Sequence, residues 1–187
     1  MIRPLTRRTA LATMAGTAFS TAATGAAVAQ QRPAARLLTP GLHPLNIVSA
    51  HSGEKFSALF IAGKRPGTIT MAMLSRLLRD HHSGAIKPID PALIELLVRI
   101  QSKTRQPLQA LSGYRSPLTN LRLRLADPAG VAEHSFHTRG MAIDFMVAGL
   151  SAERLGDIAR QCGAGGVGIY AEGFVHVDTG PVREWVG

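Results

Sequence analysis

Two histidines and one aspartate occur in a pattern that suits metal binding. Six residues separate His137 from Asp144 in the segment HSFHTRGMAID, and His176 follows in FVHVDTG. Imidazole and carboxylate groups are zinc ligands, and three protein ligands leave a fourth position for water or substrate. A zinc ion held in this way lowers the pKa of bound water and polarises a carbonyl group. The spacing alone also fits an ordinary loop and strand, so the surrounding elements must decide.

Alternation along two predicted strands places these side chains on a shared polar face. Successive side chains of a strand point to opposite faces of its sheet. In the strand predicted over residues 140–147, Asp144 faces away from the apolar positions. In FVHVDTG, His176 and Asp178 share the polar face. The apolar positions assigned to the core are Met141, Ile143, Phe145 and Val147 in the first strand and Val175 and Val177 in the second. If the strands are neighbours, the two histidines and Asp144 can converge on a metal, and from the residues alone this remains as probable as a structural role.

Turn and capping signals divide the rest of the chain into short elements. Ser52-Gly53 predicts the turn of a hairpin within residues 46–63. Helices are expected from Thr70, and after the capping pairs Asp90-Pro91 and Ser116-Pro117 and the capping residue Ser151. Further strands are expected over residues 107–113 and as a hairpin within 165–180. This order predicts an α+β fold with a small, mainly antiparallel sheet and flanking helices.

The N-terminus has the three-part layout of an export signal. A basic start containing Arg7-Arg8 precedes a weakly apolar stretch and the A-x-A site Ala27-Val28-Ala29. The arginine pair predicts the twin-arginine route to the periplasm. A membrane anchor is the alternative. The stretch is rich in Ala, Thr and Gly, however, and is too weakly hydrophobic to span a membrane well. We therefore predict a signal over residues 1–29, a flexible arm over 30–44 and one domain over 45–187, with no stable membrane insertion after cleavage.

Charge and cysteine content limit the partners. The full chain carries a formal charge of +9, and its first 29 residues contain three of its 21 basic residues. The positive balance suits an exported protein near an anionic wall or membrane surface. No basic helix or aromatic stacking run supports nucleic-acid binding. Cys162 is the only cysteine, so no internal disulfide can form, and we expect it to be a small buried hydrophobe. We expect a monomer.

Three ordered blocks resemble a known family. They are LSGYRSPLTN at 111–120, HSFHTRGMAID at 134–144 and GGVGIYAEGFVHVDTGPVREW at 165–185. Together they resemble the murein endopeptidase K-like zinc peptidases, which are related to D-Ala-D-Ala dipeptidases and carboxypeptidases. The shared signature S-x-H-x-x-G-x-A-x-D corresponds here to Ser135, His137, Gly140, Ala142 and Asp144. The resemblance extends from about Leu45 to Trp185.

The resemblance implies a ligand set and a substrate. His137, Asp144 and His176 would bind one Zn²⁺ per chain, and the substrate would be the peptide crosslinks of peptidoglycan. Arg115 would bind the carbonyl oxygen that becomes the oxyanion, a role that suits a fixed guanidinium group. From the residues alone, a structural ion pair or a surface charge would be the preferred role of Arg115.

One departure from the family concerns the general base. The dipeptidase relatives carry a glutamate three residues before the last ligand histidine, where this chain has Gly173. Glu172 is one residue too early, and a shift of one residue reverses the face of a strand. Asp178 is the preferred candidate for the base, and orienting a ligand histidine is an equally open role for it.

Other histidines are predicted not to bind the metal. His134 precedes the signature, whose Ser135 and His137 already fill their positions. His81 and His82 are expected to end a helix, where histidine interacts favourably with the helix dipole.

The leading prediction is a periplasmic zinc-dependent murein endopeptidase. The missing glutamate at position 173 motivates one alternative, a zinc-stabilised peptidoglycan-binding module without turnover. The other alternative is a D-alanyl carboxypeptidase, in which Arg122 and Arg124 are candidates to bind the free carboxylate of the substrate.

Overall fold

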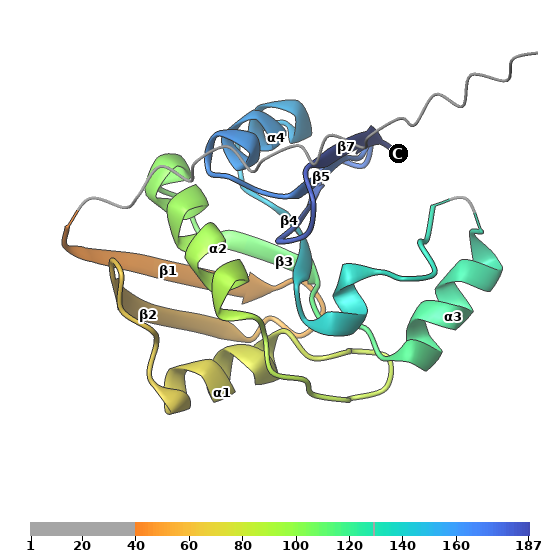
Figure 1. Ribbon diagram of the computed structural model, residues 1–187, viewed down its shortest axis with the longest axis horizontal. Helices are drawn as coiled ribbons and strands as arrows, with labels where there is room; N and C mark the ends of the chain where they lie inside the picture. Colours follow the sequence, from red (N-terminus) through yellow and green to blue (C-terminus); the bar gives the residue numbers. More distant parts are fainter. Residues whose placement is uncertain (1–39, 129) are drawn as a thin grey trace, which may run out of the picture.

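A seven-stranded mixed sheet forms the centre of the molecule (Figure 1). The structure is a computed structural model, and it describes residues 40–128 and 130–187. The predicted export signal and most of the predicted arm lie outside these residues. The strands are ordered β2-β1-β3-β4-β6-β5-β7 across the sheet. Their bounds are β1 Leu42–Ser49, β2 Lys55–Ile61, β3 Leu108–Ser112, β4 Ala142–Met146, β5 Gly166–Ile169, β6 Val175–Asp178 and β7 Arg183–Val186.

Most neighbouring strands run antiparallel. The pairs β1–β2, β3–β4, β4–β6 and β5–β6 are antiparallel, whereas β1–β3 and β5–β7 are parallel. The predicted α+β class is therefore confirmed, and so are both hairpins. The two parallel pairs were not predicted, and neither was β7. β1 begins at Leu42, inside the segment predicted as the arm.

Side-chain caps fix the starts of three helices. The helices are α1 Thr68–Leu77, α2 Pro91–Thr104, α3 Pro117–Ala126 and α4 Ala152–Gln161, with the 3₁₀ turn η1 at Phe136–Arg139. Asp90 accepts a hydrogen bond from the backbone N–H of Ala92, and Ser116 and Ser151 cap α3 and α4 in the same manner. A side-chain acceptor satisfies an N–H group that has no partner within the helix. These are the three capped starts that the sequence predicts.

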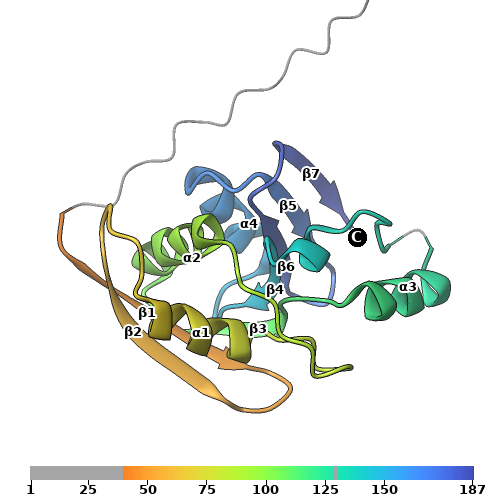
Figure 2. The same cartoon turned by 60° about the horizontal axis from the view of Figure 1, so that its bottom comes forward.

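The hydrophobic core lies between the sheet and α1, α2 and α4 (Figures 1 and 2). α1 contacts β2, α2 contacts β1, and α4 contacts β5 and β6. Ile143, Phe145 and Val147 are buried in this core as predicted, but Met141 is wrongly assigned, because it is only half-buried just before β4 begins. Cys162 is buried at the end of α4, where burial raises the pKa of its thiol. α3 projects away from the other helices (Figure 2).

The segment after α1 differs from the prediction. α1 ends at Leu77, so His81 and His82 belong to the following turn rather than to the helix end. The carboxylate of Asp80 organises this turn by accepting hydrogen bonds from the backbone N–H groups of His82, Ser83 and Ser116. Asp and its neighbouring backbone commonly form such turns, which compete with helix continuation. None of the helices within residues 40–128 and 130–187 is long and apolar enough to cross a membrane.

Two leucines on different helices provide a test of the core. The side chain of Leu97 in α2 is 0% exposed, whereas that of Leu125 in α3 is 74% exposed. We predict that Leu97→Ala lowers the free energy of unfolding by about 2–5 kcal/mol, because it removes buried methyl groups and leaves a cavity. Leu125→Ala is the matched control and should change it by less than about 0.5 kcal/mol. Urea denaturation of both variants measures the difference, and equal effects would contradict the position of the core.

Candidate metal centre

A capped turn and a glycine hold His137 at the start of β4. The Ser135 hydroxyl accepts a hydrogen bond from the backbone N–H of His137, with an N–O distance of 3.3 Å. Gly140 ends η1 with φ of 70°, a left-handed conformation that favours glycine. A Cβ atom at position 140 would lie 2.7 Å from the carbonyl oxygen of Pro88. Both constraints explain why the turn before β4 requires glycine.

Hydrogen bonds leave one nitrogen of each histidine available as a potential ligand atom. His137 Nδ1 lies 2.6 Å from the carbonyl oxygen of Gly113, which can only accept, so this nitrogen carries the proton. His176 Nε2 lies 2.9 Å from Asp178 Oδ2 and donates to that carboxylate. The unprotonated nitrogens in the neutral rings are therefore His137 Nε2 and His176 Nδ1. Partners of this kind orient metal-binding histidines in known sites.

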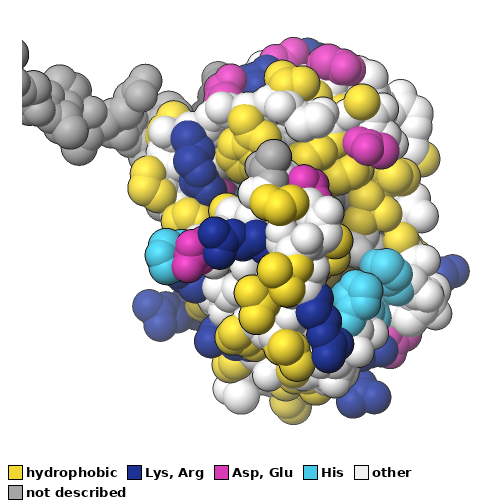
Figure 3. All heavy atoms as spheres, turned by 90° about the vertical axis from the view of Figure 1, so that its right-hand side faces the viewer, with side chains coloured by type: hydrophobic (Ala, Val, Ile, Leu, Met, Phe, Trp, Pro, Cys, Tyr) yellow, Lys and Arg dark blue, Asp and Glu magenta, His cyan; other side chains and the backbone are white. Residues whose placement is uncertain are grey.

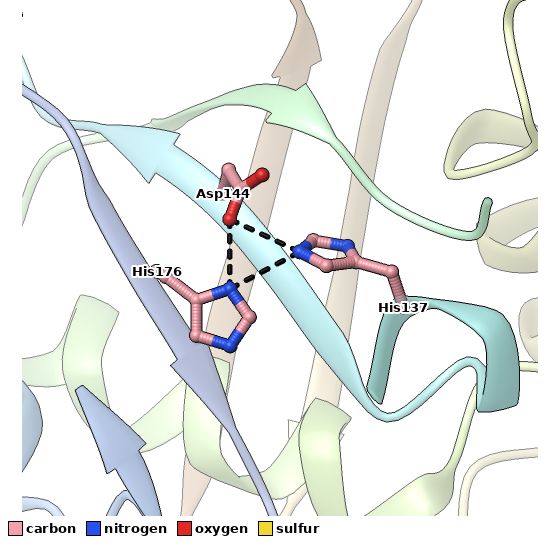
Figure 4. Close-up of side chains that lie close together, drawn as sticks. All are labelled: His137, Asp144 and His176. Carbon is pink, nitrogen blue, oxygen red and sulfur yellow. Dashed lines mark hydrogen bonds and ion pairs between the residues drawn. The ribbon is translucent and has the colours of Figure 1, made fainter. Parts of the chain in front are cut away.

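These two nitrogens and one oxygen of Asp144 form a tight triangle (Figure 4). Asp144 Oδ1 lies 3.1 Å from His137 Nε2 and 2.9 Å from His176 Nδ1, and the two nitrogens are 3.1 Å apart. Ligand atoms of a tetrahedral zinc site, at bond lengths of about 2.0–2.1 Å, lie about 3.3 Å from one another. All three side chains are buried. The donor types and their separations thus fit a metal ion with two nitrogen ligands and one oxygen ligand.

The second oxygen of Asp144 is paired with Arg115. Arg115 Nη2 donates to Asp144 Oδ2, and Arg115 Nε donates to Ser112 Oγ at 2.8 Å. Burial acts to raise the pKa of the Asp144 carboxyl, but His137, His176 and Arg115 together lower it below its usual range. Asp144 is therefore ionised, as a metal ligand must be.

The two histidines respond differently to their surroundings. Burial lowers the pKa of His137; Asp144 acts to raise it, and Arg115 lowers it further. Burial also acts to lower the pKa of His176, but hydrogen bonds to Asp144 and Asp178 outweigh it, so that this pKa is raised. The difference arises because His176 contacts two carboxylates, whereas His137 contacts one.

Asp178 lies behind His176 and is fully buried. Its Oδ1 accepts hydrogen bonds from the backbone N–H groups of Gly166 at 3.0 Å and Gly180 at 2.7 Å, and Arg183 binds both of its oxygens. Burial acts to raise its pKa, but the partners His176 and Arg183 lower it. Asp178 does not line the cleft described next. These contacts favour the second of its two predicted roles, that of orienting His176.

The three potential ligands line an open cleft of about 680 Å³. One wall follows the chain from the end of α3 to η1 and includes Arg124, Glu133 and His134. The other wall comes from the end of the chain and includes Tyr170, Phe174 and Trp185. The sequence reasoning missed Tyr170, Trp185 and Arg183, although all three lie within the third matching block and Trp185 is the only tryptophan.

Other predicted residues lie outside the triangle. Arg115 and His134 line the cleft, whereas Arg122 and Glu172 do not. His81 and His82 line a separate pocket of about 180 Å³ together with His51. Figure 3 shows histidine side chains at the surface in two separate places on one side of the molecule. No second group of three potential metal ligands occurs in the described part of the chain.

Gly173 occupies the tip of the β5–β6 turn with φ of 89°. L side chains rarely adopt this conformation, so a glutamate at this position would strain the turn. No atom lies within 4 Å of a Cβ built at this position, so the backbone conformation and not a steric clash disfavours the glutamate of the dipeptidase relatives. The carboxylates that line the cleft besides Asp144 are Asp127 and Glu133, both on the opposite wall.

A buried group of two histidines and one aspartate at the floor of an open cleft is typical of a metal-dependent hydrolase. Comparison with known proteins narrows this class. The family profile described as peptidoglycan L,D-endopeptidase MepK matches residues 38–185, and the chain belongs to this family.

Two curated relatives illustrate the similarity. The peptidoglycan L,D-endopeptidase MepK of Escherichia coli K12 is 42% identical over 166 residues, covering 87% of this chain and 91% of that protein. The probable peptidoglycan L,D-endopeptidase MepK of Haemophilus influenzae is 34% identical over 157 residues, covering 82% of this chain and 84% of that protein.

A pair of histidine variants tests the metal centre. We predict that the parent protein binds about one divalent metal ion per chain and that His137→Ala loses it, because a nitrogen ligand is removed. His134→Ala is the matched control: its side chain lines the same cleft but is not part of the triangle, so it should retain the metal. Elemental mass spectrometry of the folded proteins gives the ratio. Loss of metal from both variants, or from neither, would refute the assignment.

Proposed function

We propose that the protein is a periplasmic zinc-dependent peptidase that cleaves peptide crosslinks of peptidoglycan. The convergence of His137, Asp144 and His176 at the floor of an open cleft carries this proposal. The relatives named peptidoglycan L,D-endopeptidase support the choice of substrate, since the chain spans 91% of the Escherichia coli protein. Two nitrogen ligands and one oxygen ligand favour zinc over harder cations that prefer oxygen alone.

His137, Asp144 and His176 hold the metal, and Arg115 places a positive charge in the cleft. When bound, zinc supplies a Lewis acid that activates water and polarises a carbonyl. The guanidinium of Arg115 is fixed by Asp144 and Ser112, and it lines the cleft. A cation fixed before the reaction stabilises an oxyanion without the cost of reorganisation. Arg115 therefore binds the oxygen of the scissile carbonyl as negative charge develops on it.

Asp178 supports the centre from behind. By accepting the Nε2 proton of His176, it keeps the Nδ1 lone pair directed at the metal position. Its two oxygens are already occupied by the donors of four residues, so it has little capacity to receive a further proton. We therefore assign Asp178 the orienting role and not that of the general base.

The cleft supports internal cleavage more than removal of a terminal residue. A carboxypeptidase needs a cation free to bind the terminal carboxylate of its substrate. Of the two arginines considered for this role, Arg122 does not line the cleft, and Arg124 is paired with Glu133 at 3.0 Å. An endopeptidase needs only a cleft that is open to both sides of the bond.

The proposed substrate and the predicted N-terminal signal support a periplasmic location. Peptidoglycan lies outside the inner membrane, and the signal predicted over residues 1–29 provides a twin-arginine export route to the periplasm. Passage in the folded state would allow the metal to be inserted before export. We expect the mature protein to act there as a monomer.

Digestion of purified peptidoglycan tests the proposed reaction. We predict that zinc-loaded protein converts crosslinked muropeptide dimers to monomers, that a chelator abolishes this activity and that added zinc restores it. Liquid chromatography with mass spectrometry identifies the products. Release of D-alanine from uncrosslinked stems would instead indicate a carboxypeptidase.

The position of Gly173 motivates a further alternative, a zinc-stabilised binding module. Binding to sacculi without new products at metal saturation would favour this alternative.

An asparagine at position 178 separates the two roles of that carboxylate. We predict that Asp178→Asn lowers zinc affinity about 10- to 100-fold, as expected for loss of a partner that orients a ligand. Activity should then return to within about threefold of the parent at saturating zinc. A general base would instead leave activity about 10²- to 10⁴-fold lower at any zinc concentration. Asp157→Asn, which removes an α4 carboxylate paired with Arg160, is the matched control. Zinc titrations of activity distinguish these outcomes.

A further inference from the structure

An aromatic wall borders the metal centre on the side of β5, β6 and β7. It consists of Tyr170, Phe174 and Trp185, and all three line the cleft. The rings of Tyr170 and Phe174 are stacked, with centroids 4.4 Å apart and planes inclined by 9°. Such a wall offers apolar surface to the aliphatic parts of a peptide. Apolar packing accounts for the rings of these residues but not for the Tyr170 hydroxyl or the indole N–H group of Trp185.

The register of three strands places Trp185 beside a metal ligand. Gly168 of β5 pairs with His176 of β6 on one side and with Trp185 of β7 on the other. A Cβ atom at position 168 would lie 2.5 Å from Trp185 Cε2, so the indole lies across this glycine. The indole and the His176 ring consequently come within 5.1 Å of each other, measured between centroids.

The indole fixes the hydroxyl group of Tyr170. Trp185 Nε1 donates to the Tyr170 hydroxyl oxygen at 3.1 Å, and because an indole N–H can only donate, the hydroxyl is the acceptor. The hydroxyl proton has no acceptor among residues 40–128 and 130–187. Tyr170 is half-buried and its side chain borders the cleft. Its hydroxyl can therefore donate to a ligand in the cleft.

We infer that Tyr170 positions the substrate and that Trp185 acts through it. The Tyr170 hydroxyl donates a hydrogen bond to a carbonyl or carboxylate oxygen of the bound peptide, next to His176. Trp185 holds this hydroxyl in place by donating its own N–H group. This inference rests on the proposed peptidase function, because it assumes that a peptide occupies the cleft. It assigns no chemical step to either side chain.

The effect of removing the hydroxyl should appear in binding. We predict that Tyr170→Phe raises KM for a soluble crosslinked muropeptide dimer about 3- to 10-fold, the range expected for one hydrogen bond. The value of kcat should stay within about twofold, because the bond is made equally in the ground state and the transition state. Zinc content should equal that of the parent. The matched control is Tyr114→Phe, which removes the other tyrosine hydroxyl of the chain, outside this cleft.

A double-mutant cycle tests the link between the two residues. Trp185→Phe keeps an aromatic ring beside His176 but removes the N–H group, so it should raise KM by no more than Tyr170→Phe does. The double variant should match Tyr170→Phe, because without the Tyr170 hydroxyl the indole N–H group has nothing left to hold in place. Multiplied effects on KM would show that Trp185 acts independently and would overturn the inference, as would an unchanged KM in Tyr170→Phe.

A binding measurement keeps this inference separate from the proposed function. Calorimetric titration of chelator-treated protein with the same dimer gives a Kd without turnover. If zinc-loaded parent protein failed to cleave the dimer, the proposed function would be wrong, yet a 3- to 10-fold weaker Kd for Tyr170→Phe would still support the positioning role. Equal Kd values for parent and variant, or no binding by the parent, would overturn it.

Discussion

The site depends on the contacts of the buried Asp144 carboxylate with His137, His176 and Arg115. An ionised group taken out of water is costly unless charged or hydrogen-bonding partners compensate. Here Oδ1 contacts His137 and His176, and Oδ2 contacts Arg115. The three partners come from different parts of the chain. The sheet makes this possible because Asp144 pairs in register with His176 on β6 and with Ser112 on β3. Removal of Arg115 would leave the charge of Asp144 under-compensated. Because the contacts of Asp144 depend on strand register, the geometry of the site depends on the integrity of the central sheet.

The charges around Asp144 continue as an alternating chain. Arg115, Asp144, His176, Asp178 and Arg183 contact one another in that order. Asp178 lies between two donors, His176 Nε2 and Arg183, and Asp144 accepts a hydrogen bond from Arg115. The adjoining histidines and arginines lower the pKa of both carboxylates despite their burial. The chain also fixes the proton of His176 on Nε2. The orientation of His176, a potential metal ligand, is thus fixed by Asp178, which is itself paired with Arg183 at the start of β7.

Local patterns predicted the parts of the site that lie within single elements. Alternation in MAIDFMV and FVHVD assigned Asp144 and His176 to the polar face, because the two-residue period of a strand is a local property. Capping pairs located three helix starts for the same reason. The predictions for Met141 and for His81 and His82 were wrong because two element boundaries were misplaced. β4 begins only at Ala142, and α1 already ends at Leu77. The sequence did not indicate the burial of Asp178, because the donors that surround it come from segments whose pairing is not local.

β7, which the sequence did not predict, contributes two side chains to the surroundings of the candidate metal centre. β7 is a four-residue strand that joins the sheet edge by pairing in parallel with β5. Because β7 pairs in parallel with β5 and not with the preceding strand β6, no hairpin signal marks it in the sequence. Its residues nevertheless include Arg183, which binds Asp178, and Trp185, which lies beside His176. Alternate residues of one strand share a face, so a single register delivers both side chains to the same side of the sheet. β7 therefore completes the support of one potential metal ligand, His176, and one wall of the cleft, and a shift of one residue in its pairing would remove both.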